Sequence, residues 1–127
     1  MSNAHSSLIL ASTSQYRREI LAKLAVPFIQ VSPDFDEIPL KGEAPVAMAE
    51  RFAAGKAMAV ASDPLYIAPK NLVIGSDQVV VVNNQVLGKP GNRQRARAQL
   101  LLCSDQWVTY TSAFCLACAG AILVLEH

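Results

Sequence analysis

The sequence predicts a single α/β domain, in which a sheet is flanked by helices. Short apolar segments alternate with segments of helical periodicity along the 127 residues. Apolar residues make up 52% of the chain, which suits one modest core and is too much for a disordered protein. We expect the domain to span residues 8–118, with residues 1–7 and 125–127 as ends added during cloning.

The first half of the chain is expected to alternate between strands and helices. Residues 8–11 (LILA) are apolar without interruption, which is typical of a buried parallel strand. Apolar residues on one face then predict a helix over 17–24, with Ser14 as its N-cap. The alternating segment FIQVS at 28–32 predicts a second strand, and the Ala- and Met-rich segment 45–61 predicts a longer helix.

The second half is expected to hold a hairpin, a basic helix and a last strand. Residues 72–82 are rich in valine, but the polar group at 75–78 (GSDQ) predicts an interruption of this strand. Two asparagines then favour a tight turn, after which 85–88 (QVLG) returns as the second strand of the hairpin. The segment 92–103 predicts a helix and 107–118 a strand.

Composition and charge exclude several functional classes. The formal net charge of +1 provides no basic field for nucleic acid, and the arginines of segment 92–103 have no aromatic residues between them. The uncharged stretch from Gln106 to Leu125 is interrupted by polar residues, so we expect no membrane span. Three cysteines, an odd number, and the lack of a secretory signal predict a cytoplasmic protein without a disulfide framework.

The junction between the first strand and the first helix carries more hydrogen-bond donors than a helix cap needs. Ser12, Thr13 and Ser14 lie there, followed by Arg17 and Arg18. Free backbone N–H groups and the helix dipole make such a terminus favourable for an anion, and a guanidinium group suits phosphate. The alternative is an ordinary capped helix with two solvated arginines, since the motif lacks the glycines of a dinucleotide or P-loop fingerprint.

Asp77 is the candidate catalytic carboxylate. It follows a buried apolar segment and Gly75, where α/β domains place ligands, and it suits a general base or a ligand of a divalent cation. A turn aspartate bonded to its own backbone fits the same position. Lys89, between a glycine and a proline, and Lys56, within a helix, are candidate cations whose alternative is a solvated lysine. Glu37 belongs to an acidic loop that is either a metal ligand or simply solvated.

Five motifs together resemble one family, although each motif alone is weak. They are LILASTSQYRREIL, VSPDFDEIPLKGE, RFAAGKA, VIGSDQVVVVNNQVLGKPGNRQRARAQL and VTYTS, in this order, and they cover nearly all of residues 8–114. They resemble the Maf-like nucleotide pyrophosphatases, also called septum-formation-inhibitor-like proteins. The resemblance implies a Maf-like fold of the anticodon-endonuclease/ITPase-like kind, a mixed sheet flanked by helices, whose C-terminal part is missing from this chain.

The resemblance also implies hydrolysis of a nucleoside triphosphate to the monophosphate and pyrophosphate, with a divalent cation, Mg²⁺ or Mn²⁺, as cofactor. Asp77 is the implied catalytic carboxylate, and Glu37 and Asp77 are the candidate metal ligands. Tyr16 and Gln78 resemble the subgroup that acts on 7-methyl-GTP, whereas the subgroup that acts on dTTP and UTP has arginine and threonine there. With the two serines of the junction, the expected substrate-binding residues are Ser12, Ser14, Arg17, Lys56 and Lys89.

Two other functions fit the same sequence. The first is a catalytically inactive, truncated nucleotide-binding remnant, and the second is a non-enzymatic module that self-associates. Strands 72–82 and 107–116 are expected to lose pairing partners to the missing part, which would expose sheet edges and the apolar tail CLACAGAILVL. A homodimer would cover both, so the expected partners are a nucleoside triphosphate and a second copy of the chain.

Overall fold

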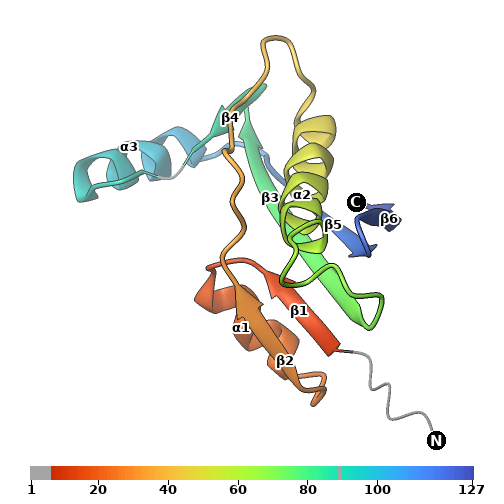
Figure 1. Ribbon diagram of the computed structural model, residues 1–127. Coiled ribbons are helices and arrows are strands. Elements are labelled where there is room, and N and C mark those ends of the chain that lie inside the picture. The colour runs from red at the N-terminus through yellow and green to blue at the C-terminus, as the bar shows by residue number, and fades with distance from the viewer. Residues whose placement is uncertain (1–6, 89) are drawn as a thin grey trace, which may run out of the picture.

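The computed structural model describes residues 7–88 and 90–127, which form a mixed sheet with a long helix packed across it (Figure 1). In chain order the elements are β1 (Ser7–Ala11), α1 (Gln15–Ala22), β2 (Phe28–Val31), α2 (Pro45–Ala61), β3 (Asn71–Val82), β4 (Gln85–Leu87), α3 (Arg93–Cys103), β5 (Val108–Cys118) and β6 (Ala121–Glu126). The predicted α/β class with a mixed sheet is confirmed. Within the described residues, no helix is both long enough and apolar enough to span a membrane.

The sheet changes from parallel to antiparallel at β3, and its strand order is β2-β1-β3-β5-β6. β1 lies parallel between β2 and β3, with Ile9 opposite both Ile29 and Val73. β5 then pairs antiparallel along β3 from Val73 to Val82, and β4 and β6 are antiparallel to their neighbours. The uninterrupted apolar sequence of β1 fits a strand that has a partner on each side and whose two faces are covered.

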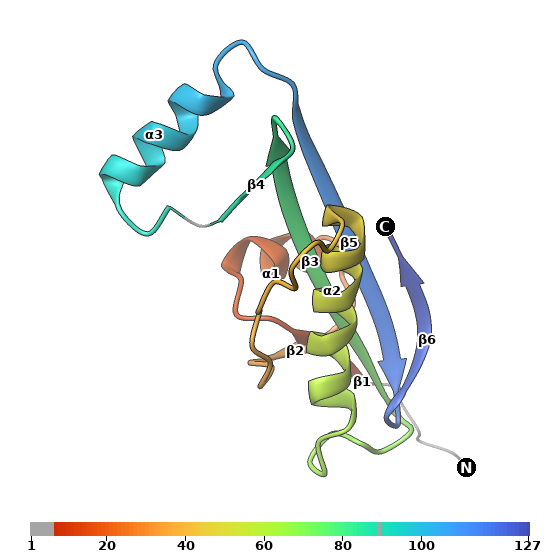
Figure 2. The same cartoon turned by 90° about the horizontal axis from the view of Figure 1, so that it is seen from above.

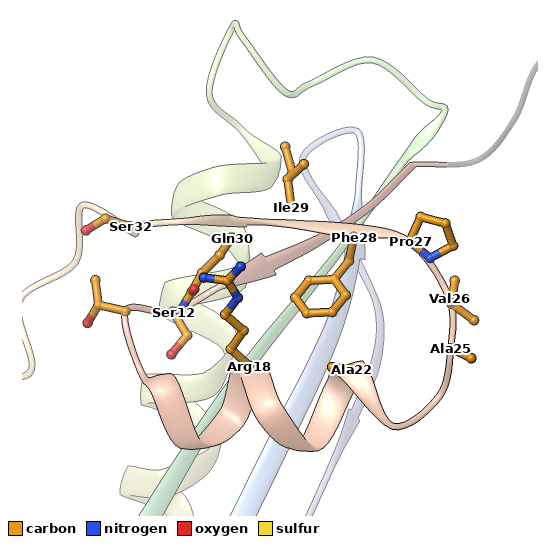
Figure 3. Close-up of a pocket in the computed structure, with 11 residues that line it drawn as sticks. Ser12, Arg18, Ala22, Ala25, Val26, Pro27, Phe28, Ile29, Gln30 and Ser32 are labelled. Carbon is orange, nitrogen blue, oxygen red and sulfur yellow. The ribbon is translucent and has the colours of Figure 1, made fainter.

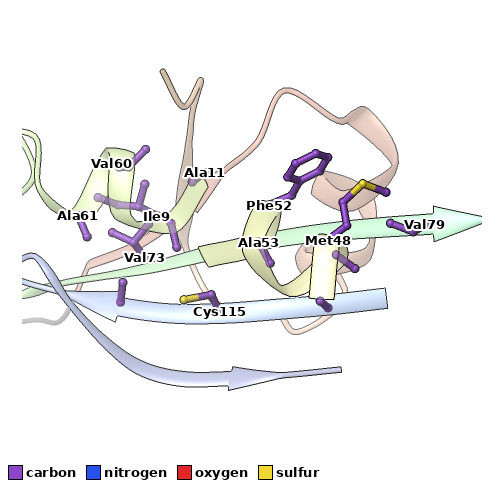
Figure 4. Packing of buried hydrophobic residues seen from close by; sticks show 14 residues of the cluster. Ile9, Ala11, Met48, Phe52, Ala53, Val60, Ala61, Val73, Val79 and Cys115 are labelled. Atoms are coloured by element: carbon purple, nitrogen blue, oxygen red, sulfur yellow. The ribbon is translucent and has the colours of Figure 1, made fainter. Parts of the chain in front are cut away.

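Helix α2 lies across β3 and β5 and forms the core with them (Figures 2 and 4). Its buried residues recur three and four positions apart, as the period of 3.6 residues requires. They pack against alternate residues of the strands, whose side chains point to one face. The buried cluster consists of Ile9, Ala11, Met48, Ala49, Phe52, Ala53, Ala57, Val60, Ala61, Val73, Val79, Ala113, Cys115 and Ala117.

The many alanines of this cluster let α2 approach the sheet closely, and Gly75 of β3 is a point of very close approach. A Cβ atom at Gly75 would lie 2.6 Å from the backbone nitrogen of Ala57 and closer still to the carbonyl oxygen of Ala53. Gly55 of α2 makes room in the same way for the ring of Phe35, which a Cβ atom would overlap. Both glycines therefore allow packing distances that no other residue permits.

The predicted interruption of the strand at residues 75–78 is wrong. β3 runs unbroken from Asn71 to Val82, and its register with β5 continues through Gly75, opposite Cys115, and Asp77, opposite Ala113. The polar residues are compatible with a strand because successive side chains point to opposite faces of a sheet. Asp77 therefore lies within a strand and not in a turn after it.

The prediction that strands 72–82 and 107–116 lack pairing partners is wrong for much of their length, although residues 75–79 and 108–113 are paired on one side only within the described chain. β1 and β4 pair with one edge of β3, β5 pairs with the other edge, and β6 pairs with β5. The prediction failed because the apolar tail was not recognised as a strand: Ala119 and Gly120, both with positive φ, turn the chain back into β6. The sheet consequently extends beyond the predicted boundary at residue 118, and its outermost strands are β2 and β6.

Replacing Gly75 with alanine tests the close approach of α2 to β3. The added methyl group meets backbone atoms that cannot rotate away, so α2 has to shift and core contacts are lost. We expect Gly75→Ala to lower the free energy of unfolding by about 2–3 kcal/mol in urea titrations. Gly88→Ala is the matched control, because a Cβ atom there meets nothing within 4 Å. Equal urea midpoints for the two variants would contradict the packing described above.

Candidate active site

The centre of the candidate site is the ammonium group of Lys56, which contacts two carboxylates. Lys56 lies on the buried side of α2, and its side chain is only 8% exposed. Its Nζ donates to Oδ1 of Asp77 at 3.1 Å and to the carbonyl oxygen of Ser76 at 3.3 Å, and it forms an ion pair with Glu37. A buried ammonium group requires such partners, because its desolvation is otherwise strongly unfavourable.

The carboxyl group of Asp77 is buried between α2 and β3. Burial raises its pKa above the usual value of 3.8, and the negative charge of Glu37 acts in the same direction. The charges of Lys56 and Arg17 oppose this rise, and so does the hydrogen bond from Lys56. A desolvated carboxylate with a specific cationic partner, beside a cavity, is typical of a catalytic acid or base.

The loop between β2 and α2 brings Glu37 to Lys56, and Arg51 of α2 fixes this loop. Nε of Arg51 donates to Oε2 of Glu43 at 2.7 Å, and its Nη2 donates to Oε1 at 2.9 Å. The same Nη2 donates to the carbonyl oxygen of Ile38 at 2.7 Å. The hydrogen bond from Arg51 holds the pKa of Glu43 below its usual value, as expected for a bidentate ion pair. Since Ile38 follows Glu37 directly, this contact also positions the Glu37 carboxylate.

The junction of β1 and α1 places Arg17 beside Asp77. Oγ of Ser14 accepts from the backbone N–H of Arg17 at 3.2 Å, which confirms Ser14 as the N-cap of α1. Oγ of Ser12 accepts from the N–H of Ser14 at 3.0 Å, and the amide of Gln30 donates to the carbonyl oxygen of Ser14 at 3.2 Å. These bonds fix the turn, and Arg17 is then close enough for its charge to lower the pKa of Asp77.

Three cavities meet at Arg17, which lines each of them. One of about 670 Å³ lies between α1 and the sheet, and Asp77 lines it as well. A second, of about 330 Å³, reaches from the β1–α1 junction to Glu37 and Lys56. A third, of about 360 Å³, extends from Lys56 and Asp77 to β4. The guanidinium group of Arg17 therefore lies where space for the rest of a ligand opens in several directions.

The first and third of these cavities are lined by residues of β3 at a gap along one edge of this strand. On this edge β1 pairs with residues 71–74 and β4 pairs with residues 80–82. Between these two ladders, no strand of the described chain pairs with residues 75–79 on that side. The gap lies beyond the carboxyl end of β1, which is where open α/β sheets bind ligands.

Most of the predicted site residues line these cavities. Tyr16 is 71% exposed and lines the largest of the three, together with Gln78. Ser12 is buried, and its hydroxyl is used within the turn, so it contributes to the second cavity chiefly by shaping the junction. Lys89 lies outside the described residues. The predicted residues that line at least one of the three cavities are Ser12, Ser14, Tyr16, Arg17, Glu37, Lys56, Asp77 and Gln78.

Arg18 does not join this site, although it is the neighbour of Arg17 in the sequence. Successive residues of an α-helix point roughly 100° apart, so the two guanidinium groups leave α1 in different directions. Arg18 points toward β2, where it lines a separate cavity of about 940 Å³ with Phe28 and Gln30 (Figure 3). Of the two arginines in the motif, only Arg17 lines the cavities that contain Asp77.

Sequence reasoning missed two residues that shape the site, Arg51 and Ser112. Ser112 lies opposite Gln78 in the register of β3 and β5, and its Oγ accepts from Nε2 of Gln78 at 3.1 Å. The two residues are 34 positions apart in the sequence, so their contact cannot be predicted before the register of β3 against β5 is known. The burial of Lys56 did have a signal, because this lysine falls on the apolar face of α2 and therefore needs a buried partner.

Asp77 and Glu37 are the residues best placed to hold a cation. Both contact Nζ of Lys56, so both lie within reach of one cationic group. In the part of the chain that the structure describes, no three His, Cys, Asp or Glu side chains form a group suited to a metal ion. The pair fits Mg²⁺ bound by one or two carboxylates together with water and substrate phosphates, and not a site made of protein ligands alone.

Comparisons with known proteins show which family the chain belongs to. The 7-methyl-GTP pyrophosphatase of Bordetella pertussis is 51% identical over 106 residues, which are 84% of this chain and 51% of that protein. The enzyme of the same name from Pseudomonas putida is 50% identical over 109 residues, 86% of this chain and 55% of that protein. This chain thus spans about half the length of these curated relatives. A family model described as Maf-like protein matches residues 7–124, almost the whole sequence, and the chain therefore belongs to the Maf-like family.

Proposed function

We propose that this chain holds the phosphates and the catalytic carboxylate of a nucleoside-triphosphate pyrophosphatase whose substrate is 7-methyl-GTP. The observation that supports this most is the meeting of Arg17, Lys56 and Asp77 where three cavities join. Hydrolysis of a triphosphate requires cations beside the phosphate oxygens and a base that activates water, and these are the residue types present. Because the chain spans about half the length of its relatives, the activity of the whole protein is part of this proposal.

In the proposed reaction, a water molecule attacks the α-phosphorus of the nucleotide. A bond forms between the water oxygen and this phosphorus while the bond to the bridging oxygen of the β-phosphate breaks, which releases the monophosphate and pyrophosphate. Asp77 accepts the proton that the attacking water loses. Arg17 and Lys56 offset the negative charge that develops on the pyrophosphate, and Lys89 joins them by resemblance to the family.

The proposal includes a divalent cation, Mg²⁺ or Mn²⁺, held by Glu37 and Asp77 together with the phosphates of the substrate. When bound, such a cation supplies further neutralisation of phosphate charge. Lys56 pairs with both carboxylates and so lowers the repulsion between them. Its contact with the carbonyl oxygen of Ser76 anchors this ammonium group to β3.

The choice of 7-methyl-GTP is supported by the names of the relatives and by two residues. The relatives from Bordetella pertussis and Pseudomonas putida are both called 7-methyl-GTP pyrophosphatase. Tyr16 and Gln78, which resemble this subgroup, line the cavity between α1 and the sheet beside Arg17. The exposed ring of Tyr16 is suited to a methylated, cationic base, because aromatic faces attract such groups.

Release of pyrophosphate from a panel of 7-methyl-GTP, GTP, dTTP and UTP in the presence of Mg²⁺ tests the proposed reaction. We expect turnover of 7-methyl-GTP to exceed that of the other three, and Asp77→Asn to reduce it on the order of a hundredfold or more. Asparagine is nearly isosteric with aspartate but cannot accept the proton. Circular dichroism melts of the variant should show that the fold is kept.

The same experiment distinguishes the other outcomes. Faster turnover of dTTP than of 7-methyl-GTP would contradict the proposed substrate but not the proposed class of reaction. Binding of 7-methyl-GTP in a calorimeter without any turnover would identify an inactive nucleotide-binding chain. An active and well-folded Asp77→Asn variant would show that another residue is the base.

The titration of Asp77 tests the electrostatics of the site without any need for activity. Its raised pKa means that the carboxyl group gains its proton at a higher pH than a solvated aspartate, so the proposed base is lost as the pH falls through that raised value. We expect the ¹³C resonance of this carboxyl group, in metal-free buffer, to titrate with a midpoint above 3.8. Glu37→Gln should lower the midpoint and Lys56→Met should raise it, because these residues act on the pKa in opposite directions. Shifts of the reverse sign would contradict the geometry.

A homodimer in the cytoplasm completes the proposal, and the dimer has a structural basis in β6. β6 is an outermost strand of the sheet, and it exposes Ile122 by 47% and Leu123 by 59%. The odd number of cysteines, three, supports the proposed reducing compartment.

Light scattering over a dilution series in reducing buffer tests the dimer. The mass should rise from 13.6 kDa toward twice that value as the protein concentration increases. We expect Leu123→Lys to weaken association about tenfold or more, because a charge on an edge strand opposes strand pairing. Leu100→Lys is the matched control, since Leu100 is also an exposed leucine but lies on α3, which projects away from the sheet (Figure 1). A constant mass of 13.6 kDa would exclude the dimer.

A further inference from the structure

The cavity between α1 and the sheet has the character of a site for a nucleobase. Its walls are largely apolar and include Leu10, Ile20, Leu24 and Ile74, and its volume is about 670 Å³. Arg17 and Asp77 line one end, so the cavity is continuous with the place where the phosphates are proposed to bind. A nucleotide whose phosphates lie at Arg17 can extend its base into this cavity.

Gln78 and Ser112 are a hydrogen-bonded polar pair in the lining of this cavity. They occupy opposite positions in the antiparallel ladder of β3 and β5, and both side chains point to the face that carries α1. Nε2 of Gln78 donates to Oγ of Ser112 at 3.1 Å. A carboxamide carries its donor and its acceptor at opposite ends of one plane, so a partner that engages the nitrogen also fixes the direction of the oxygen.

We propose that Ser112 is a positioning residue for substrate choice: it holds the Gln78 amide so that Oε1 is presented to the bound base as a hydrogen-bond acceptor. The inference rests on the proposed function, because it requires the base of the nucleotide to lie in this cavity. An acceptor at this place favours a base that presents N–H donors side by side. Guanine does so with its ring N–H and its exocyclic amino group. A base without the amino group leaves part of this acceptor unpaired, which lowers its affinity.

A purely structural role for Ser112 is the competing explanation. Cross-strand polar pairs also stabilise sheets, and Ser112 is exposed. In that case its removal would lower stability and leave the preference between two bases unchanged. The proposal instead requires that removal of the Ser112 hydroxyl group lowers the preference for guanine over a base without the amino group.

The test measures binding and not turnover. Calorimetry with Mg²⁺ compares the α,β-methylene analogues of 7-methyl-GTP and 7-methyl-ITP, which differ only in the exocyclic amino group and cannot be cleaved at the bond in question. We expect the wild-type chain to bind the guanine analogue about tenfold more tightly. Ser112→Ala should reduce this ratio to about twofold or less, and Ser112→Thr should restore it. Thr109→Val is the matched control, because Thr109 lies on the same strand but on the opposite face.

Nuclear magnetic resonance provides a second readout in the free protein. The side-chain amide protons of Gln78 should exchange with water faster in Ser112→Ala than in the wild type. The amide of Gln99, which donates to the carbonyl oxygen of Gly88 at 2.6 Å, serves as an internal control and should not change.

The possible results separate this inference from the proposed function. Failure of the wild-type chain to bind either analogue would overturn both. Binding with a preference that Ser112→Ala leaves unchanged would overturn the role of Ser112 alone. An unchanged exchange rate at Gln78 in that variant would do the same, because the amide would then be held by something else.

Discussion

The contact of the Lys56 ammonium group with Asp77 is the interaction on which the rest of this structure depends. It joins the buried face of α2 to the middle of β3, so one ion pair belongs both to the core and to the candidate active site. A lysine at this depth requires a carboxylate, and burial raises the pKa of the Asp77 carboxyl group even though the charge of Lys56 opposes the rise. The pair can form only because α2 approaches β3 closely, and Gly75 permits that approach. A change that moves α2 outward therefore loosens the core and alters the titration of the proposed base.

The other charged side chains of the site are arranged around this contact. Glu37 adds a second carboxylate to the single ammonium group, and the bidentate pair of Arg51 and Glu43 holds the loop that carries it. Arg17 makes the formal charge of this group zero, because the two positive charges of Lys56 and Arg17 equal the two negative charges of Asp77 and Glu37. A triphosphate adds several negative charges to a site that is balanced without it. This is a physical reason to propose a divalent ion there.

Much of the fold could be predicted from local sequence patterns, and the errors occurred where pairing between distant segments decides the structure. The apolar run of β1, the alanine-rich α2 and the Asn-Asn turn, whose residues have φ of 50° and 61°, are local features. β3 was predicted to break at GSDQ because these residues are poor strand formers, but β5 supplies a partner along the whole segment. Residue types left the roles of Arg17, Lys56 and Asp77 open, and the resemblance to the Maf-like family selected them before any geometry was known. The Gln78–Ser112 bond could not be foreseen, because it depends on the register of β3 against β5.

The gap in the edge of β3 explains how neighbouring residues can serve different parts of one substrate. Asp77 and Gln78 point to opposite faces of the sheet, the first toward α2 and the second toward α1. In a sheet with a continuous edge, a small ligand could not reach both. Here the pairing of β1 with β3 ends at residue 74 of β3, and β4 pairs with β3 only from residue 80. The space at Arg17 therefore connects the two faces of the sheet. In the proposed complex, a nucleotide crosses this gap with its phosphates beside Lys56 and its base beside Gln78, so that the alternation of a single strand would separate catalysis from recognition.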